Sequence, residues 1–195
     1  METKKLIRKQ VLALRDGMDP DLQIEKSHDI MEKCVSHFEF LQAENILIFA
    51  SFGSEVRTMG IIQYAFLLGK KVFCPRIEHG EMHFVRIFAA QDLQPGFHGI
   101  SEPSPDNTEK WQRESDFKTL MILPGLAFTK DGERLGYGGG FYDSFLAKGF
   151  CGTKMAICFS EQVISAIPVE EHDATVDYLI TEDEVLECEP FDFLN

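Results

Sequence analysis

The chain has 195 residues, of which 44% are hydrophobic and 26% are charged, values typical of one globular domain with a sizeable core. Its 19 basic and 32 acidic residues give a net charge of −13, which disfavours nucleic acid and anionic membranes as partners. The sequence has neither an apolar signal core at its start nor an apolar run of about 18 residues. We therefore expect a cytoplasmic protein. We also expect small-molecule partners and a monomer, with a dimer as the alternative, although composition does not give the oligomeric state.

A basic helix is predicted over residues 3–18, where apolar residues recur at a spacing of four, three and four. Lys4 and Arg8 fall one turn apart on one face, and Lys5 and Lys9 form a second such pair. These cations are typical either of a solvated helix face or of a surface that binds an anion. The apolar residues of this helix are Ile7, Val11, Leu14 and Met18.

A second helix is predicted to begin at Asp19-Pro20, because aspartate is a favoured helix cap and proline suits the first turn. Apolar residues continue at helical spacing, and we expect them to pack on the core. His28 falls among them and is expected to be a packing residue rather than a ligand. The set consists of Ile24, His28, Met31, Val35 and Phe38.

Residues 45–52 form a nearly continuous apolar run, as expected of a buried parallel strand. A Gly-Ser-Glu turn follows at 53–55, and a helix is predicted over 58–68. Ligands of open α/β sheets bind beyond the carboxyl ends of the strands, which is where Glu55 lies. Its carboxylate could accept paired hydrogen bonds from the amide and amine edge of a flat heterocycle, or it could be an exposed loop acid.

Strands that alternate with helices indicate a mostly parallel sheet that is covered on both faces. We find no internal repeat and no interdomain linker, so residues 1–195 are predicted to form a single domain. Within it, the helical segment 1–40 is expected to pack on the α/β core. The further strands are predicted at 71–75, 82–88, 120–123 and 153–159.

The five cysteines are scattered along the chain without a Cys-x-x-Cys pair, so neither a zinc knuckle nor a disulfide framework is predicted. We expect them to be buried free thiols. They are Cys34, Cys74, Cys151, Cys158 and Cys188.

The strand at 120–123 leads into a loop with Arg134 and four glycines within five positions, after which a helical pattern opens. Glycine tolerates positive φ and lets a ligand approach the backbone, and N–H groups at a helix start attract anions. Arg134 adds a permanent cation, and Asp143 in the first helical turn could hold Mg²⁺ beside phosphates. The segment therefore predicts a phosphate-binding loop, with a flexible surface loop as the alternative. The glycines are Gly136, Gly138, Gly139 and Gly140.

Two familiar nucleotide motifs are excluded by the spacing of this loop. The P-loop requires Gly-Lys-Ser/Thr after its glycines, and that sequence is absent. A dinucleotide fingerprint would require a third glycine at a position occupied by Phe141 or Asp143.

The same segment resembles the signature of the 5-formyltetrahydrofolate cyclo-ligases, also called methenyltetrahydrofolate synthetases. Residues 124–128 read Pro-Gly-Leu-Ala-Phe, and residues 132–143 read Gly-Glu-Arg-Leu-Gly-Tyr-Gly-Gly-Gly-Phe-Tyr-Asp. The resemblance covers nearly the whole chain, including Ser-Glu-Val at 54–56 and the ending at 167–181. It implies a three-layer α/β/α sandwich with a mostly parallel sheet, similar to that of the CoA-transferase and ribose-phosphate isomerase group.

The resemblance also implies a reaction, the ATP- and Mg²⁺-dependent conversion of 5-formyltetrahydrofolate to 5,10-methenyltetrahydrofolate with release of ADP and phosphate. ATP would phosphorylate the formyl oxygen, and N10 of the folate would then close the ring. The implied ATP contacts are Lys4, Lys5, Arg8, Arg134, Leu135, Gly136, Tyr137, Gly138, Gly139, Gly140, Phe141 and Tyr142. The implied folate contacts are Ala50, Glu55, Met82, His98 and Tyr142. Tyr142 and Arg134 would be catalytic. The ending supplies the acids Asp173 and Asp177, of which Asp177 would bind Mg²⁺ together with Asp143.

Three departures and two alternatives accompany this interpretation. His98 stands where the family tends to carry an aromatic residue, Arg57 where it often carries an acid or amide, and Ser144 where a basic residue is common. Phe141 has no hydroxyl group, so it can only pack. A non-catalytic sensor of a phosphorylated metabolite would use the loop and the cations without Mg²⁺ ligands. A sugar-phosphate isomerase of similar architecture would need neither ATP nor the basic first helix.

Overall fold

The computed structural model describes residues 3–168, 170 and 173–188, so both ends of the predicted 1–195 domain lie outside the described residues. The described residues form a seven-stranded sheet in the order β11-β10-β9-β6-β1-β2-β3. The five inner strands are parallel to one another, whereas β3 and β11 pair antiparallel with them at the two edges. The α/β class and the mostly parallel sheet are thus confirmed. These strands are β1 (Asn45–Ile48), β2 (Lys71–Glu78), β3 (Glu81–Ile87), β6 (Thr119–Leu123), β9 (Thr153–Ile157), β10 (Tyr178–Ile180) and β11 (Val185–Glu187).

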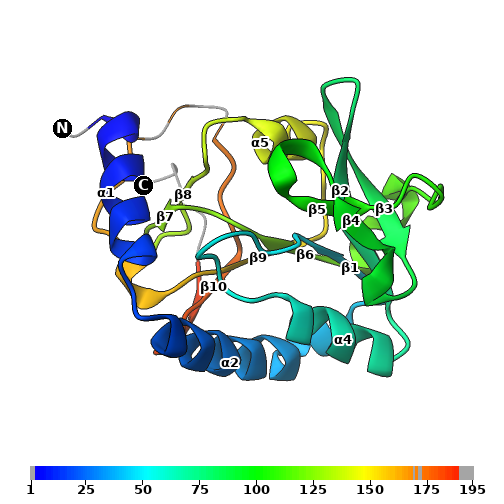
Figure 1. Cartoon of the computed structure of the whole chain (residues 1–195), viewed down its shortest axis with the longest axis horizontal. Helices are drawn as coiled ribbons and strands as arrows, with labels where there is room; N and C mark the ends of the chain where they lie inside the picture. Colours follow the sequence, from blue (N-terminus) through cyan, green and yellow to red (C-terminus); the bar gives the residue numbers. More distant parts are fainter. Residues whose placement is uncertain (1–2, 169, 171–172, 189–195) are drawn as a thin grey trace, which may run out of the picture.

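Alternation along the strands divides the core between the two faces of the sheet. In β6, Leu120 and Ile122 belong to one apolar cluster, and Met121 and Leu123 belong to the other. The first cluster is covered by three helices, of which α2 and α4 lie along one side of the sheet in Figure 1. The opposite face is covered by the short helix α5 and neighbouring loops. The helices are α2 (Pro20–Ser36), α3 (Phe38–Gln42), α4 (Met59–Leu67) and α5 (Phe141–Leu146).

Helix α1 (Lys4–Asp16) packs away from both faces, on a small hairpin formed by β7 (Ala127–Phe128) and β8 (Arg134–Leu135). Ile7 and Val11, one turn apart, form a separate apolar cluster with residues of this hairpin. Because the hairpin follows β6, α1 lies beside the carboxyl end of the central strands (Figure 1). The remaining short elements are β4 (Leu93–Pro95), β5 (Ser101–Pro103) and the 3-10 helices η1 (Ala90–Asp92), η2 (Phe97–Gly99), η3 (Arg113–Lys118) and η4 (Ser160–Gln162).

The predicted faces of the first two helices need correction. In α1, Leu14 is exposed, whereas the neighbouring Arg15 is buried. Helix α2 begins as predicted, with an Asp19 carboxylate oxygen accepting a hydrogen bond from Asp21 N. Most of its predicted apolar stripe nevertheless faces solvent, and His28 forms an exposed ion pair with Glu32 instead of packing. The buried positions of α2 are Gln23, Ser27, Ile30, Cys34 and Val35.

Two polar side chains explain this different face of α2. The Gln23 amide donates hydrogen bonds to the carbonyls of Arg15, at 2.9 Å, and Met18, at 3.4 Å. The Ser27 hydroxyl accepts a hydrogen bond from Arg57 N at 3.1 Å. Burial of polar groups costs little when they are hydrogen-bonded, so both residues can face the core and satisfy backbone groups of other segments.

The cysteines are free, and four of the five are buried as expected. Cys151 is exposed, so the expectation of burial is wrong there. It lies in the turn between α5 and β9, where its N–H donates to the Asp116 carboxylate at 3.1 Å and fixes the backbone rather than the thiol.

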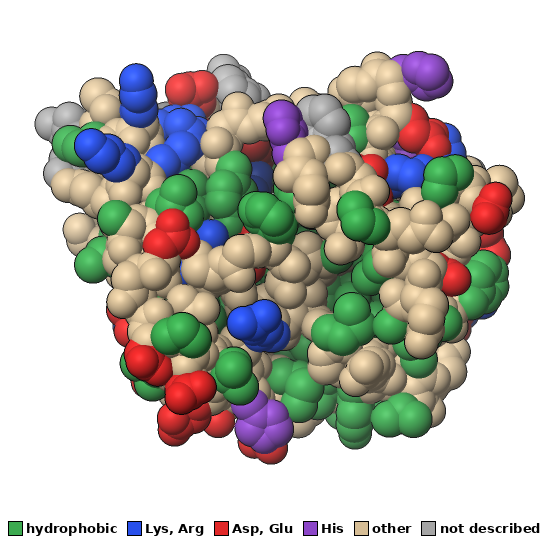
Figure 2. All heavy atoms as spheres, viewed as in Figure 1, with side chains coloured by type: hydrophobic (Ala, Val, Ile, Leu, Met, Phe, Trp, Pro, Cys, Tyr) green, Lys and Arg blue, Asp and Glu red, His purple; other side chains and the backbone are tan. Residues whose placement is uncertain are grey.

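The surface of the molecule carries its basic groups unevenly despite the negative total charge. Lys and Arg side chains gather over α1 in the view of Figure 2. Within the ranges that the structure describes, no helix combines the length and the apolar character required to cross a bilayer.

We predict that Ile30→Ala will lower the free energy of unfolding by about 2–5 kcal/mol, because the deletion leaves a cavity in the core. Ile30 is fully buried, whereas Ile24 on the same helix is 54% exposed. Ile24→Ala is therefore the matched control and should change the free energy of unfolding by no more than about 0.5 kcal/mol. Urea denaturation of the three proteins measures both values. Equal losses would show that the assigned face of α2 is wrong.

Candidate active site

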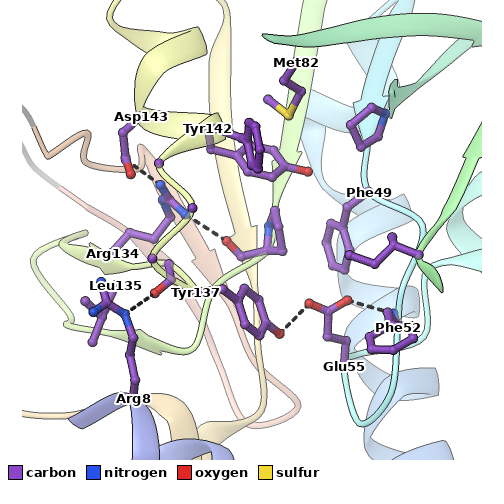
Figure 3. Close-up of a pocket in the computed structure, with 18 of the residues that line it drawn as sticks. Arg8, Phe49, Phe52, Glu55, Met82, Arg134, Leu135, Tyr137, Tyr142 and Asp143 are labelled. Carbon is purple, nitrogen blue, oxygen red and sulfur yellow. Dashed lines mark hydrogen bonds and ion pairs between the residues drawn. The ribbon is translucent and has the colours of Figure 1, made fainter. Parts of the chain in front are cut away.

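A cavity of about 1280 Å³ lies at the carboxyl ends of β1 and β6, as expected for an open α/β sheet. One wall carries most of the charge, and the other is mainly apolar (Figure 3). All predicted site residues line this cavity except Lys5 and Asp177. Its walls come from α1, the turn after β1, β2, β3, the 98–102 loop, the 134–144 segment and the acids Glu170 and Asp173.

The glycine run 136–140 links β8 to α5 and lines the cavity along its whole length. Gly138 and Gly140 have φ values of 101° and 67°, a region that only glycine adopts without strain. The carbonyl of Gly136 accepts a hydrogen bond from Arg8 Nε at 2.8 Å. The loop is therefore a fixed wall of the site, and a cation lies against it.

Arg134 is buried and joins the two ends of this loop. Its Nη2 is 2.5 Å from Asp143 Oδ1, and its Nη1 donates to the Pro124 carbonyl at 3.3 Å (Figure 3). A methyl group at Gly136 would lie 3.1 Å from Nη1, so glycine leaves room for the guanidinium. The guanidinium carbon is also 5.8 Å from the ring centre of Tyr142. A permanent charge is thus held behind the glycine run.

Lys4 lies on the same face of α1 as Arg8, and its partners are two acids near the end of the chain. Its Nζ is 2.6 Å from Asp173 Oδ2 and 3.3 Å from Glu170 Oε1. Desolvation lowers the pKa of Lys4, but the hydrogen bonds and charges of these acids outweigh it and raise the pKa. The site therefore holds a charged lysine between acids. Glu170 was missed by the sequence interpretation, and Asp173 was named there without a role.

Two predicted site residues lie elsewhere. Lys5 is exposed, because one step along a helix turns a side chain by about 100° from the face of Lys4. Asp177 directly precedes β10, at the amino ends of the parallel strands, whereas the cavity lies at their carboxyl ends. Its carboxylate accepts from Lys154 N at 2.7 Å and from Lys154 Nζ at 2.9 Å. Asp143 lines the cavity and Asp177 does not, so we withdraw both Asp177 and Lys5 from the site.

Glu55 points into the cavity from the turn after β1, toward the hydroxyl of Tyr137 (Figure 3). Its Oε1 accepts a hydrogen bond from that hydroxyl at 2.5 Å, and its Oε2 accepts one from Phe52 N at 2.9 Å. Burial raises the pKa of Glu55, and these two bonds with the charge of Arg15 act in the opposite direction. Tyr137 belongs to the predicted nucleotide contacts, yet its hydroxyl reaches the predicted folate side.

The apolar wall consists of flat and flexible side chains that could enclose a heterocycle. Phe49 and Ala50 follow β1, and Met82 reaches the cavity from β3. The Tyr142 hydroxyl points into the cavity in Figure 3, and burial raises the pKa of this group, which keeps it a neutral donor. The cavity can therefore hold a flat polar molecule beside an anion. Further lining residues are Pro75, Ile77, His98, Ile100 and Phe141.

The fold and the cavity define an α/β protein that can bind an anionic group and a flat heterocycle side by side. The sequence profile of the 5-formyltetrahydrofolate cyclo-ligase family matches residues 1–182. The 5-formyltetrahydrofolate cyclo-ligase of Mus musculus is 30% identical over 190 residues, 92% of this chain and 94% of the mouse protein. That of Saccharomyces cerevisiae is 31% identical over 209 residues, 94% of this chain and 97% of the yeast protein.

Solved structures agree with the sequence comparison. The 5,10-methenyltetrahydrofolate synthetase of Aquifex aeolicus superposes with a TM-score of 0.84 at 28% identity, covering 98% of this chain and 96% of that one. The Mycoplasma pneumoniae synthetase has the same fold, with a TM-score of 0.74 at 19% identity, covering 93% and 99%. The chain belongs to the 5-formyltetrahydrofolate cyclo-ligase family and is an enzyme of that class, a ligase that forms a cyclic C–N bond.

The raised pKa of Glu55 predicts how stability depends on pH. The folded state holds the Glu55 proton more tightly than the unfolded state, so wild-type stability falls as pH rises above the ordinary value of 4.5. Glu55→Gln lacks this loss. Its stability relative to wild type should therefore improve between about pH 4 and about pH 7. Denaturant titrations of both proteins across this range measure the difference. A difference that stays constant or moves the other way would contradict the burial of this charge.

Proposed function

We propose that this enzyme uses ATP and Mg²⁺ to convert 5-formyltetrahydrofolate into 5,10-methenyltetrahydrofolate, with release of ADP and phosphate. Family membership supports the folate conversion. The observation that carries the use of ATP is that the glycine run and Arg134 lie across one cavity from Glu55. Two further expectations stay predictions. One is that the sandwich is similar to that of the CoA-transferase and ribose-phosphate isomerase group, and the other is the cytoplasmic location.

In the proposed reaction, the formyl oxygen of the substrate attacks the γ-phosphorus of ATP, and the bond to ADP breaks. Phosphorylation makes the formyl carbon electrophilic, so N10 attacks this carbon and closes the ring. The C–O bond then breaks, phosphate leaves with the oxygen, and N10 loses its proton, which the departing phosphate can accept. Because no residue forms a covalent bond, the protein supplies position and charge neutralisation.

Each wall of the cavity would contribute to positioning and charge neutralisation. Arg8 and Arg134 would neutralise the phosphates, next to the backbone of 136–140. Glu55 would accept hydrogen bonds from the amide and amine edge of the pterin, between Ala50 and Met82. The Tyr142 hydroxyl, kept protonated by burial, would donate a hydrogen bond near the reacting oxygen.

The acids of the cavity fit a magnesium ion that is held mainly by phosphate and water. Among the described residues, no three His, Cys, Asp or Glu side chains form a metal cluster, so this part of the chain offers no complete cage. Mg²⁺ is commonly bound through one or two carboxylates plus substrate phosphates. Asp143 lines the cavity beside the glycine run, and Asp173 replaces Asp177 as the second candidate ligand. The ion would neutralise phosphate charge when bound.

Purified protein incubated with MgATP and 5-formyltetrahydrofolate should form the methenyl chromophore and one ADP per product. Binding of both ligands without product would favour the non-catalytic sensor. Turnover of a sugar phosphate without ATP would favour the isomerase. Either outcome would contradict the proposed reaction.

We predict that Asp143→Asn will lower kcat/KM on the order of 10²-fold, because it removes a charge that aligns Arg134 and could hold the ion. Asp177→Asn is the matched control, since Asp177 lies outside the cavity and pairs with Lys154. Its kcat/KM should stay within about threefold of wild type. Circular dichroism checks that both variants fold. A large loss in Asp177→Asn with little change in Asp143→Asn would reverse our assignment.

A further inference from the structure

Arg15 is a buried cation in the last turn of α1 that has no role in the predicted site. It is 4% exposed and lines the cavity at the end where Glu55 lies. Its Nε donates to the Ser54 hydroxyl at 2.9 Å, and its Nη1 donates to the Tyr137 hydroxyl at 2.8 Å. A buried charge is costly unless it is well hydrogen-bonded, so its position requires a physical reason.

The direction of the hydrogen bonds at Tyr137 follows from chemistry. A guanidinium can only donate hydrogen bonds, and an ionised carboxylate can only accept them. Since Arg15 donates to the Tyr137 oxygen, the hydroxyl proton is left for Glu55 Oε1, 2.5 Å away. Phe52 N holds the other carboxylate oxygen at 2.9 Å. The chain Arg15–Tyr137–Glu55 thus fixes both the hydroxyl proton and the carboxylate.

The charges around Glu55 show how the hydrogen-bonded series Arg15–Tyr137–Glu55 would act on a ligand. Burial of Glu55 favours its neutral form, and Arg15 is the cation that acts against this effect. Burial and the nearby Glu55 charge raise the pKa of Tyr137, so it stays a neutral donor. The other titratable groups that act on this corner are Tyr142 from α5 and Asp16, which accepts a hydrogen bond from Ser54. Arg15 is therefore the positive member of the group.

We propose that Arg15 is a positioning residue that acts through Tyr137 to keep the Glu55 carboxylate ionised and aimed at the N–H groups of the bound heterocycle. The inference rests on the proposed function, because it gives Glu55 the folate ring as its ligand. In this role Arg15 would act through Tyr137, without a contact of its own to the pterin or the phosphates. A purely structural Arg15 would support folding without changing how catalysis depends on pH.

The test compares wild type with Arg15→Gln, Arg15→Lys and Tyr137→Phe between about pH 5 and about pH 8. KM for 5-formyltetrahydrofolate should rise about tenfold in Arg15→Gln and Tyr137→Phe, because an ordered hydrogen bond to a charged group is lost. KM for ATP should change by less than about threefold. The acid limb of kcat/KM should move to higher pH in Arg15→Gln and return toward the wild-type position in Arg15→Lys, which keeps the charge.

Tyr64→Phe is the matched control, because Tyr64 lies on α4, outside the cavity, and should give wild-type values. Suppose that wild type is active and that the Arg15 and Tyr137 variants have the wild-type KM for 5-formyltetrahydrofolate and the wild-type acid limb of kcat/KM. This result would overturn the inference but not the proposed function. An equal rise in both KM values would also overturn the inference. Wild type without turnover would overturn the proposed function, and the inference with it. If Arg15 variants fail to fold, Tyr137→Phe, which keeps the ring, decides the question.

Discussion

The ion pair between Arg134 and Asp143 is the interaction on which the architecture of the site depends. It connects β8 to the first turn of α5 and so closes the glycine run at both ends. A buried pair of this kind contributes little net stability, but removal of one partner leaves an uncompensated charge, which makes the geometry specific. Because Arg8 also holds the Gly136 carbonyl, contacts within the protein itself hold the loop in place. Such preorganisation lowers the entropy cost of binding.

The charges in the cavity alternate in sign, which bears on the kind of ligand it can accept. The chain carries a net charge of −13, yet Lys4, Arg8 and Arg134 converge on one wall. Asp143 is paired with Arg134, and Asp173 with Lys4. A bare anion would have to compete with these acids for the cations. An anion that arrives with a divalent cation satisfies both sets, which supports a metal–nucleotide complex as the ligand.

The sequence allowed the loop and five of the seven strands of the main sheet to be predicted, because these depend on local patterns. Strands β10 and β11 were missed, since each has only three residues and carries little pattern of its own. The strand cores are apolar runs. The glycine run has positive φ at Gly138 and Gly140, which glycine adopts without strain. The face of α2 could not be predicted, since Gln23 and Ser27 are hydrogen-bonded to backbone groups outside the helix. The Asp177 assignment failed for a similar reason. Its partner Lys154 comes from a neighbouring strand, and spacing along the chain carries no sign of that contact.

Helix α1 connects these observations, because it borders the cavity over its whole length. A helix rises about 1.5 Å per residue, so Lys4 and Arg15 are separated by roughly 16 Å along the axis. Arg8 therefore lies at the glycine run and Lys4 at Asp173, while Arg15 lies at Tyr137, the partner of Glu55. The helix is held there by Ile7 and Val11, which pack on the β7–β8 hairpin that also carries Arg134. One hairpin thus sets the position of both the loop and the helix, and the first helix is a wall of the site rather than an appendage to the domain.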